Sequence, residues 1–412
     1  MKKVILSHPT GNANVKAAAN GFAKANLLAK FVTAIAVFKG TFAFSIFGIG
    51  PLKEFRRRTF PDSLKKITTK YPWNELARMM ALKLKLRALV NHEVGKFSID
   101  SICRHLDGKV AALITKEGEI DAVYAYEDAA LASFSAAKKK SLICLYDLPI
   151  GYWRSMHELL NVEIKSRPAW AASMGGVNDS LQKLERKDQE LGMSDHIFVA
   201  SDFTKKTLQA YPYKLAPITV IPYGFPEVGF PKTYEPLINR PLRLLFVGGL
   251  SQRKGIANLF EAVANFGDKV TLTVVGRKPS LDCRPLDEYL EQHHWIPSLP
   301  HHEILQLMRE NDIFVFPSLF EGFGLVITEA MSQGTPVITT ERTCGPDLIE
   351  HGKNGWLIEA GNTNALTKQI EVILADPAVI EQNGFLAMET AKQRPWAKYE
   401  KELSEAVLKI IE

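Results

Sequence analysis

The chain has 412 residues, of which 46% are hydrophobic and 23% are charged, a balance typical of a globular protein of about two domains. Its four cysteines are far apart and include no CxxC pair, which argues against a zinc site and against a disulfide framework. The net charge of +6 conceals an asymmetry. Residues 1–224 carry 33 Lys and Arg against 20 Asp and Glu, whereas the remainder carries 18 against 25.

The first half alternates short apolar segments with helical stretches, which is the pattern of a parallel α/β sheet. Strands are expected at residues 3–7, 31–38, 122–126, 142–146, 196–200 and 218–221. Residues 61–112 are mostly helical in pattern. The apolar run 31–50 contains Lys39 and three glycines, so it is predicted to be a strand and a loop and not a membrane-spanning helix.

A cluster of prolines and glycines at 225–241 predicts a linker between two domains, at 1–224 and 242–395. The second half then repeats the α/β pattern. Strands are expected at 242–247, 270–275, 313–316 and 336–339, and helices at 256–266, 302–310 and 325–332. An amphipathic helix at 396–412 is expected to pack back on the first domain. Two such domains place ligands at the carboxyl ends of their strands.

Residues 316–331 hold the strongest motif, in which an apolar strand is followed by Gly322 and Gly324 and then by an apolar helix. Glycine lets backbone N–H groups approach a phosphate, and a helix N-terminus attracts an anion. Glu321 on the turn and Glu329 on the helix can each accept two hydroxyl hydrogen bonds from a sugar or a ribose. The motif predicts a phosphate and sugar site, although a plain strand–helix turn has a similar sequence.

A second glycine-rich turn follows the strand at 242–247. Gly249 and Gly255 flank two adjacent cations, Arg253 and Lys254. Cations over such a loop suit a pyrophosphate and can stabilise its charge as it leaves. A solvated basic turn is the alternative interpretation of this segment.

The two turns together resemble the C-terminal domain of glycosyltransferase family 4, the retaining group 1 glycosyltransferases of GT-B fold. The resemblance covers essentially all of residues 196–360. It is also carried by segments 199–203, 221–224, 330–338 and 345–355. It implies an α/β chain of two Rossmann-like, doubly wound domains that face each other across a cleft, with the donor bound by the second domain.

The resemblance also implies roles for individual residues. Glu321 would contact the transferred sugar, and Glu329 would hold the ribose hydroxyls. Lys254 and Arg253 would bind the donor diphosphate, with Arg253 acting in place of the arginine that many members carry where this chain has Gly249. The predicted donor-binding set is Arg253, Lys254, Glu321, Gly322, Phe323, Gly324, Glu329, Arg277, Ile296, Gly11 and Asn12.

The first half supplies the acceptor-side candidates. Asn12 and Asn14 follow the first strand and are expected to meet phosphate or sugar hydroxyls, with capping of the next helix as the alternative. Asp147 is expected to orient or deprotonate the acceptor hydroxyl, alongside Glu321 and Lys254 as the catalytic set; capping of a strand end is its alternative role. Tyr146, where relatives often carry a histidine, and Glu127 complete the acceptor side.

No metal or other cofactor is expected, because the sequence contains no Asp-x-Asp and because His8, His92 and His157 show no ligand spacing. Cations and helix dipoles would neutralise the leaving diphosphate of a UDP- or GDP-linked sugar. The resemblance implies retention at the anomeric carbon, and the preferred hypothesis is front-face attack with the donor phosphate accepting the proton. A GT-B nucleotide-sugar epimerase and a non-catalytic membrane-associated scaffold remain as alternatives.

The expected partners are a nucleotide sugar and a glycan or lipid-linked acceptor of cell-surface polysaccharide or glycolipid synthesis, and no nucleic acid. Basic clusters at 56–58, 65–66 and 138–140 predict contact with an anionic membrane surface. A soluble acceptor and a merely solvated basic face are the alternatives. No secretory signal is expected, and the expected location is the cytoplasm, with peripheral attachment to the inner face of the membrane.

Overall fold

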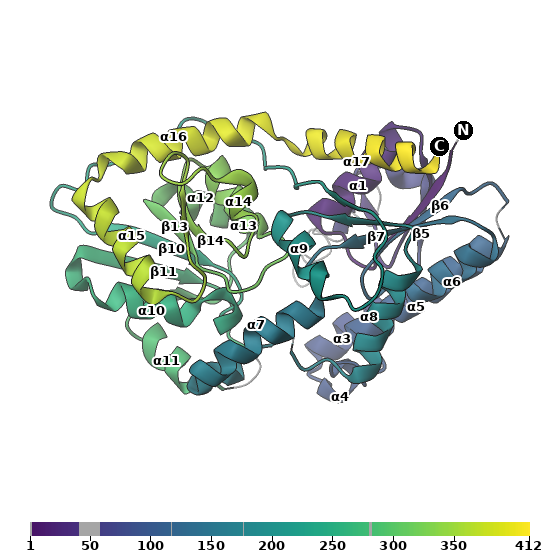
Figure 1. Ribbon diagram of the computed structural model, residues 1–412, viewed down its shortest axis with the longest axis horizontal. Helices are drawn as coiled ribbons and strands as arrows, with labels where there is room; N and C mark the ends of the chain where they lie inside the picture. The colour runs from purple at the N-terminus through teal and green to yellow at the C-terminus, as the bar shows by residue number, and fades with distance from the viewer. Residues whose placement is uncertain (1, 41–57, 117, 176, 280–281) are drawn as a thin grey trace.

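The computed structural model describes residues 2–40, 58–116, 118–175, 177–279 and 282–412, which form two α/β lobes (Figure 1). No helix in these ranges is long and apolar enough to cross a bilayer. Residues 31–40 of the apolar run include strands, and the rest of that run lies outside the described residues.

The N-terminal lobe is built on a seven-stranded sheet with the order β5-β2-β1-β6-β7-β8-β9. Every pairing in it is parallel. The strands are β1 (Val4–Ser7), β2 (Leu28–Thr33), β5 (Thr68–Lys70), β6 (Ala122–Tyr126), β7 (Ile143–Leu148), β8 (His196–Val199) and β9 (Ile218–Val220). The order reverses beside β1, so the crevice between β1 and β6 is the topological switch point where such sheets bind ligands.

Helices cover both faces of this sheet because alternate strand residues point to opposite sides. One face packs against α1 (Ala13–Lys24) and α17 (Trp396–Ile411). The other packs against α5 (Ile99–Lys116), α6 (Leu131–Lys139) and α8 (Leu181–Met193). The near-continuous apolar runs of the strands follow from burial on both sides.

The C-terminal lobe repeats this design in a six-stranded sheet with the order β12-β11-β10-β13-β14-β15. Its strands are β10 (Leu242–Val247), β11 (Val270–Val275), β12 (His294–Ile296), β13 (Ile313–Phe316), β14 (Val337–Thr340) and β15 (Trp356–Ile358). Its helices are α10 (Ile256–Ala264), α11 (Arg284–Leu290), α12 (His301–Glu310), α13 (Leu325–Ser332), α14 (Gly345–Leu348), α15 (Thr363–Ala375) and α16 (Ala378–Gln393). The switch point lies between β10 and β13, which carry the two glycine-rich turns.

The structure corrects some expected elements. The strand expected at 31–38 is divided into β2 and a separate β3 (Val37–Phe38), which pairs with β4 (Thr59–Phe60). The stretch expected to be helical begins with a 3-10 turn and with β5. The short strands β12 and β15 were not expected. A strand of three residues is too short to show a period in the sequence.

One segment of the first half departs from a division of the chain at residue 224. Helix α7 (Trp153–Ser166) and the 3-10 turn Pro168–Ser173 extend toward the C-terminal lobe (Figure 1). Arg167 donates to Glu261 at 2.7 Å, and the Trp170 ring lies 6.2 Å from that of Tyr289. This segment therefore packs on the C-terminal lobe.

The chain crosses back at its end, where α16 gives way to α17. Helix α17 lies along α1, and a Cβ atom on Gly21 would approach the Glu400 carbonyl oxygen to 2.6 Å. The side chain of Asn20 donates to Glu400 at 2.8 Å. Because both α7 and α17 cross between the lobes, the chain joins them in more places than the linker at 225–241.

Candidate active site

Three cavities lie where the carboxyl ends of the two sheets meet. The inner cavity, of about 320 Å³, is lined by both lobes, with Asn14 on one side and Glu321 on the other. The middle cavity, of about 660 Å³, shares Lys254 with it. The outer cavity, of about 510 Å³, shares Asn12 with the inner cavity and Arg277 with the middle one. The three cavities therefore form one cleft at both switch points.

The turn after β10 holds Arg253 and Lys254 in this cleft. Gly255 has φ +70°, and a Cβ atom there would lie 2.0 Å from the Pro317 carbonyl oxygen, so only glycine fits. The buried Gln252 side chain accepts the N–H of Ala257 at 2.8 Å and thereby ties the turn to α10. The sequence builds a rigid turn that presents two cations.

Both cations are largely buried, with side chains 21% exposed for Arg253 and 13% exposed for Lys254. Lys254 forms an ion pair with Glu321 and lies 5.0 Å from the centroid of the Phe316 ring. Arg253 donates to the Phe320 carbonyl at 2.7 Å. Burial lowers the pKa of both side chains, and the charge of Arg253 lowers the pKa of Lys254 further. An anion that entered the inner cavity would relieve this cost of burying positive charge.

The turn after β13 brings the two lobes into backbone contact. A Cβ atom on Gly322 would lie 2.0 Å from the Pro149 carbonyl oxygen. The Gly322 carbonyl accepts from the hydroxyls of Ser201, at 2.6 Å, and Thr204, at 2.8 Å. Gly324 then takes φ +90° and directly precedes α13, whose N-terminus is capped by no side chain. Phe323 and Gly324 line the inner cavity, so this helix end adds its dipole to the two cations.

The N-terminal lobe contributes the loop after β1. Asn12 lines the inner and outer cavities, and Gly11 lines the outer one. Asn14 lines the inner cavity and donates to the Tyr223 hydroxyl at 3.2 Å. Asn12 makes no side-chain cap of α1, so the capping alternative does not hold for it.

Glu127 lies on the N-terminal side of the middle cavity. Its Oε2 is 3.4 Å from Nζ of Lys187, and its buried Oε1 has no hydrogen-bond partner among the residues that the structure describes. Burial raises its pKa to about 7, against the opposing effect of Lys187. A buried oxygen without a donor, beside a cavity, is suited to accept a hydroxyl hydrogen bond.

Two predicted residues lie elsewhere, and their assignments are corrected. Tyr146 is fully buried on the face of the sheet that carries α6, with its ring 6.2 Å from that of Phe134. The next residue, Asp147, points to the opposite face, is 3% exposed and accepts from the Tyr124 hydroxyl at 2.6 Å. Burial raises its pKa to about 7. Neither lines the cleft cavities, because strand residues alternate between buried faces.

Of the remaining donor-site candidates, Glu329 and Ile296 lie outside the lining of the cavities, whereas Arg277 is part of it. Glu329 is on α13, outside the lining of the three cavities, with its carboxylate 2.9 Å from Nε2 of His301. The Ile296 carbonyl accepts the N–H of Gly276 at 3.0 Å, which holds the turn that carries Arg277. Arg277 itself lines the middle and outer cavities. Contacts of Glu329 and Ile296 with a nucleotide stay predictions.

The structure adds His8 to the site, although its sequence pattern indicated a structural role. His8 lines the inner cavity, and burial lowers its pKa to about 4, so it is neutral at pH 7. Its position directly after β1 was the signal that it faces the cleft, since the carboxyl end of the central strand meets the cleft.

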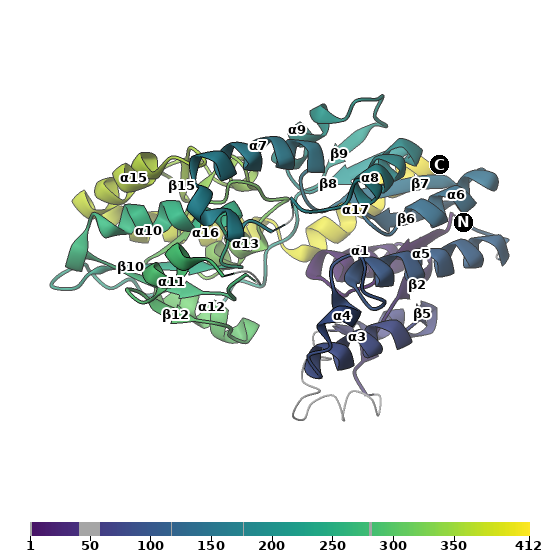
Figure 2. The ribbon, with the colours of Figure 1, turned by 90° about the horizontal axis from the view of Figure 1, so that it is seen from below.

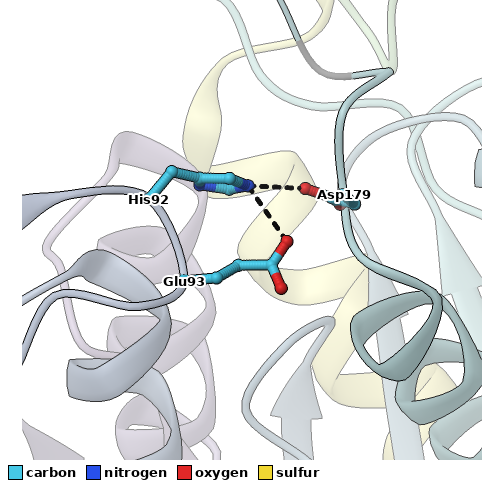
Figure 3. A group of neighbouring side chains, drawn as sticks. All are labelled: His92, Glu93 and Asp179. Carbon is cyan, nitrogen blue, oxygen red and sulfur yellow. Dashed lines mark hydrogen bonds and ion pairs between the residues drawn. The ribbon is translucent and has the colours of Figure 1, made fainter.

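A possible metal site, formed by His92, Glu93 and Asp179, lies beside the middle cavity (Figure 3). Oδ1 of Asp179 is 3.1 Å from Nζ of Lys183, and Oδ2 is 3.3 Å from Nζ of Lys187. These ammonium groups already neutralise the carboxylate that would attract a metal cation. The group is better explained as an ion-pair network that joins the loop after α4 (Arg87–Val90) to the start of α8.

Residues 235–389 match the family model described as "Glycosyl transferases group 1". The matched segment contains both glycine-rich turns and the buried pair Lys254 and Glu321. This domain belongs to the group 1 glycosyl transferases.

Curated relatives match part of the chain. The capsular polysaccharide biosynthesis glycosyltransferase CapM of Staphylococcus aureus is 30% identical over 157 residues, which are 37% of this chain and 41% of that protein. The amylovoran biosynthesis glycosyltransferase AmsK of Erwinia amylovora is 32% identical over 36% of this chain and 40% of that protein. The chain thus spans about two fifths of the length of these relatives.

Solved structures match the whole chain. Sucrose-phosphate synthase from Thermosynechococcus elongatus aligns with a TM-score of 0.66 at 17% identity, over 100% of this chain and 99% of that one. Anabaena Alr3699/HepE in complex with UDP and glucose aligns with a TM-score of 0.63 at 17% identity, over 99% and 100%. The chain has the expected GT-B fold, in which the group 1 domain is the second of two facing Rossmann-like lobes.

Proposed function

We propose that the chain transfers a sugar, with retention, from a nucleotide-diphosphate sugar to a glycan or lipid-linked acceptor. The observation that carries this proposal is the group of Lys254, Arg253 and Glu321 near the head of α13, in which Lys254 and Glu321 line the inner cavity and Arg253 lines the adjoining middle cavity. Two cations and an uncapped helix N-terminus suit a diphosphate, and a carboxylate beside them suits sugar hydroxyls. CapM is named as a polysaccharide glycosyltransferase, and the Anabaena protein binds UDP-glucose; both support this donor chemistry.

In the proposed complex the diphosphate lies between Lys254, Arg253 and the backbone of Phe323 and Gly324. It displaces the ion pair of Lys254 with Glu321, which frees the carboxylate to accept hydroxyls of the transferred sugar. Glu329 holds the ribose, and the turn with Arg277 and Ile296 lies near a uracil or guanine base.

The chemical step depends on charge stabilisation. As the anomeric carbon–oxygen bond breaks, negative charge collects on the leaving diphosphate, where the preorganised cations and the α13 dipole stabilise it without a metal. The acceptor oxygen attacks the same face of an oxocarbenium-like centre. Its proton passes to the donor phosphate oxygen. Glu127 takes the positioning role first assigned to Asp147, by accepting a hydrogen bond from the acceptor with its unpaired Oε1.

A panel of nucleotide sugars tests the proposal. Thermal stabilisation by one donor, acceptor-dependent release of nucleoside diphosphate and an unchanged anomeric configuration in the product are the expected results. An inverted product would overturn the retaining mechanism. Epimerised donor without acceptor would indicate an isomerase, and full biological function of Lys254→Ala and Glu321→Ala variants would indicate a scaffold.

A further inference from the structure

The N-terminal lobe exposes a row of large apolar side chains on α3 (Trp73–Lys83) and on the turn that joins it to α4. Trp73 is 79% exposed, Met80 55% and Leu84 61%. Positions 73, 80 and 84 recur at 7 and 4 residues and therefore share one face of the helix. Leu82, which lies on another face of the helix, and Leu86 are also exposed, as are all of residues 82–88. We call these five apolar residues and the surface around them the α3–α4 surface.

The charged residues of this part of the sequence are mostly basic. Residues 64–90 contain seven Lys and Arg against one acid, Glu75. Glu75 is buried and is already paired with Arg58, at 2.7 Å, and Arg78, at 3.0 Å. In the segment Leu82 to Arg87 leucines alternate with cations, and Lys85 and Arg87 are exposed. The surface therefore combines apolar side chains with an excess of basic over acidic residues.

The surface also borders the cleft. Arg78, Met79 and Leu82 of α3 line the outer cavity, which Asn12 and Arg277 line from the other side. Figure 2 shows α3 and α4 together on one side of the N-terminal lobe, below α1 in that view. A partner that contacted the C-terminal end of α3, where Leu82 lies, would therefore border the outer cavity.

We propose that the α3–α4 surface docks on an anionic lipid membrane. Apolar side chains can enter the headgroup boundary while neighbouring cations contact anionic lipids, which is how peripheral proteins bind bilayers. An apolar patch alone would fit many partners, whereas the positive charge between its leucines selects an anionic one. The proposal rests on the proposed function, because it commits the acceptor to the lipid-linked class, presented to the outer cavity by the bilayer.

The full-length chain should be tested by co-sedimentation with vesicles. Phosphatidylcholine vesicles containing phosphatidylglycerol are expected to bind it at low salt, and pure phosphatidylcholine vesicles are not. The variant Leu84→Ser with Leu86→Ser should lose about tenfold or more in partitioning. Lys85→Glu with Arg87→Glu should abolish the preference for anionic vesicles. The control Phe385→Ser removes an apolar side chain that is 59% exposed on α16 of the other lobe, and it should bind like the wild type.

Tryptophan emission gives a second readout. Emission of the wild type should shift to shorter wavelength on anionic vesicles, and Trp73→Phe should lose most of that shift. No binding at low salt, or equal loss in the Phe385→Ser control, would overturn the proposal. A dimer in light scattering that disappears in the leucine variant would instead assign the surface to a second copy. Transfer to a soluble acceptor is measured separately, so failure of docking and failure of the proposed function are distinguishable.

Discussion

The ammonium group of Lys254 is paired with the carboxylate of Glu321 inside the inner cavity, 5.0 Å from the centroid of the Phe316 ring. The two residues come from turns after different strands, β10 and β13, which are neighbours in the sheet. The pair neutralises a cation whose side chain is only 13% exposed. Under the proposed function, donor binding exchanges one partner of Lys254 for another.

Lys254→Ala should lower kcat/KM for the donor by about 10²–10³, because it removes a preorganised charge from the leaving group. Steady-state kinetics with the best donor of the panel measures this effect. The matched control is Lys353→Ala, which removes an exposed lysine of the same lobe that pairs with Glu350 and should leave kcat/KM unchanged. A similar loss in both variants would contradict the assigned role of Lys254.

Glu321→Gln should separate sugar recognition from diphosphate binding. Transfer should fall by about 10²-fold, since a neutral amide accepts sugar hydroxyls less strongly than a carboxylate. Affinity for the free nucleoside diphosphate should stay equal or rise, because Lys254 is no longer held by an ion pair. Calorimetric titration with the diphosphate checks this prediction. A weakened diphosphate affinity would show that Glu321 organises the turn and does not compete for Lys254.

The C-terminal part of this site was predictable from sequence for a physical reason. Strands β10 and β11 and helix α13 have the expected bounds, since long apolar runs ending at glycines leave few alternatives. A close approach such as that of Gly255 to Pro317 requires glycine, and the sequence shows it directly. The sequence of these segments alone was therefore enough to predict the positions of the two cations and of Glu321.

The N-terminal part could not be predicted in the same way. Whether Tyr146 or Asp147 faces the cleft depends on which layers cover β7, which its own sequence does not reveal. Glu127 meets Lys187 only because α8 packs beside β6 and β7. Likewise, nothing local indicates that Trp170 packs on the other lobe. Contacts between distant segments decide these positions.

Gly255→Ala should destabilise the chain by about 3 kcal/mol or more, since it combines a left-handed backbone with a Cβ atom 2.0 Å from the Pro317 carbonyl oxygen. Gly352→Ala is the matched control, with φ +79° and nothing within 4 Å of the added Cβ, and should cost only about 1 kcal/mol. The difference between the two variants in urea unfolding isolates the steric contribution to the loss of unfolding free energy. Equal costs would mean that the turn can shift away from Pro317 freely.

Asp147→Asn should change the pH dependence of stability. Burial raises the pKa of this carboxyl in the folded chain from 3.8 to about 7, so the folded state binds the proton more tightly than the unfolded state. The wild type therefore loses stability as pH rises from about 4 through about 7. Asparagine does not ionise, so the stability of the variant relative to the wild type should rise by about 2–3 kcal/mol between pH 5 and pH 8.

Urea unfolding of both proteins at several pH values measures this difference in unfolding free energy. Other buried carboxyls, such as Glu127 and Glu190, contribute equally to both proteins, so their contributions cancel in the difference. If the unfolding free energies of the two proteins changed with pH in parallel, the buried, protonated state of Asp147 would be contradicted. Turnover of the variant should remain within about tenfold of the wild type, because Asp147 lines no part of the cleft; a loss comparable to that of Lys254→Ala would restore Asp147 as a catalytic base.

Thr204→Val should weaken the contact that holds the two lobes at the turn before α13. It removes one of the two hydroxyls that donate to the Gly322 carbonyl, at 2.8 Å, and leaves a buried acceptor with a single partner. We expect a loss of about 1–2 kcal/mol in unfolding free energy. The donor KM should rise several-fold while kcat changes less, because the next residues, Phe323 and Gly324, line the inner cavity, where the donor is proposed to bind. The control is Thr367→Val, whose hydroxyl donates at 3.0 Å to a carbonyl of its own helix, α15, and which should be close to neutral in both measurements. If the two variants behave alike, the hydroxyl contact between the lobes has no special part in shaping the donor site.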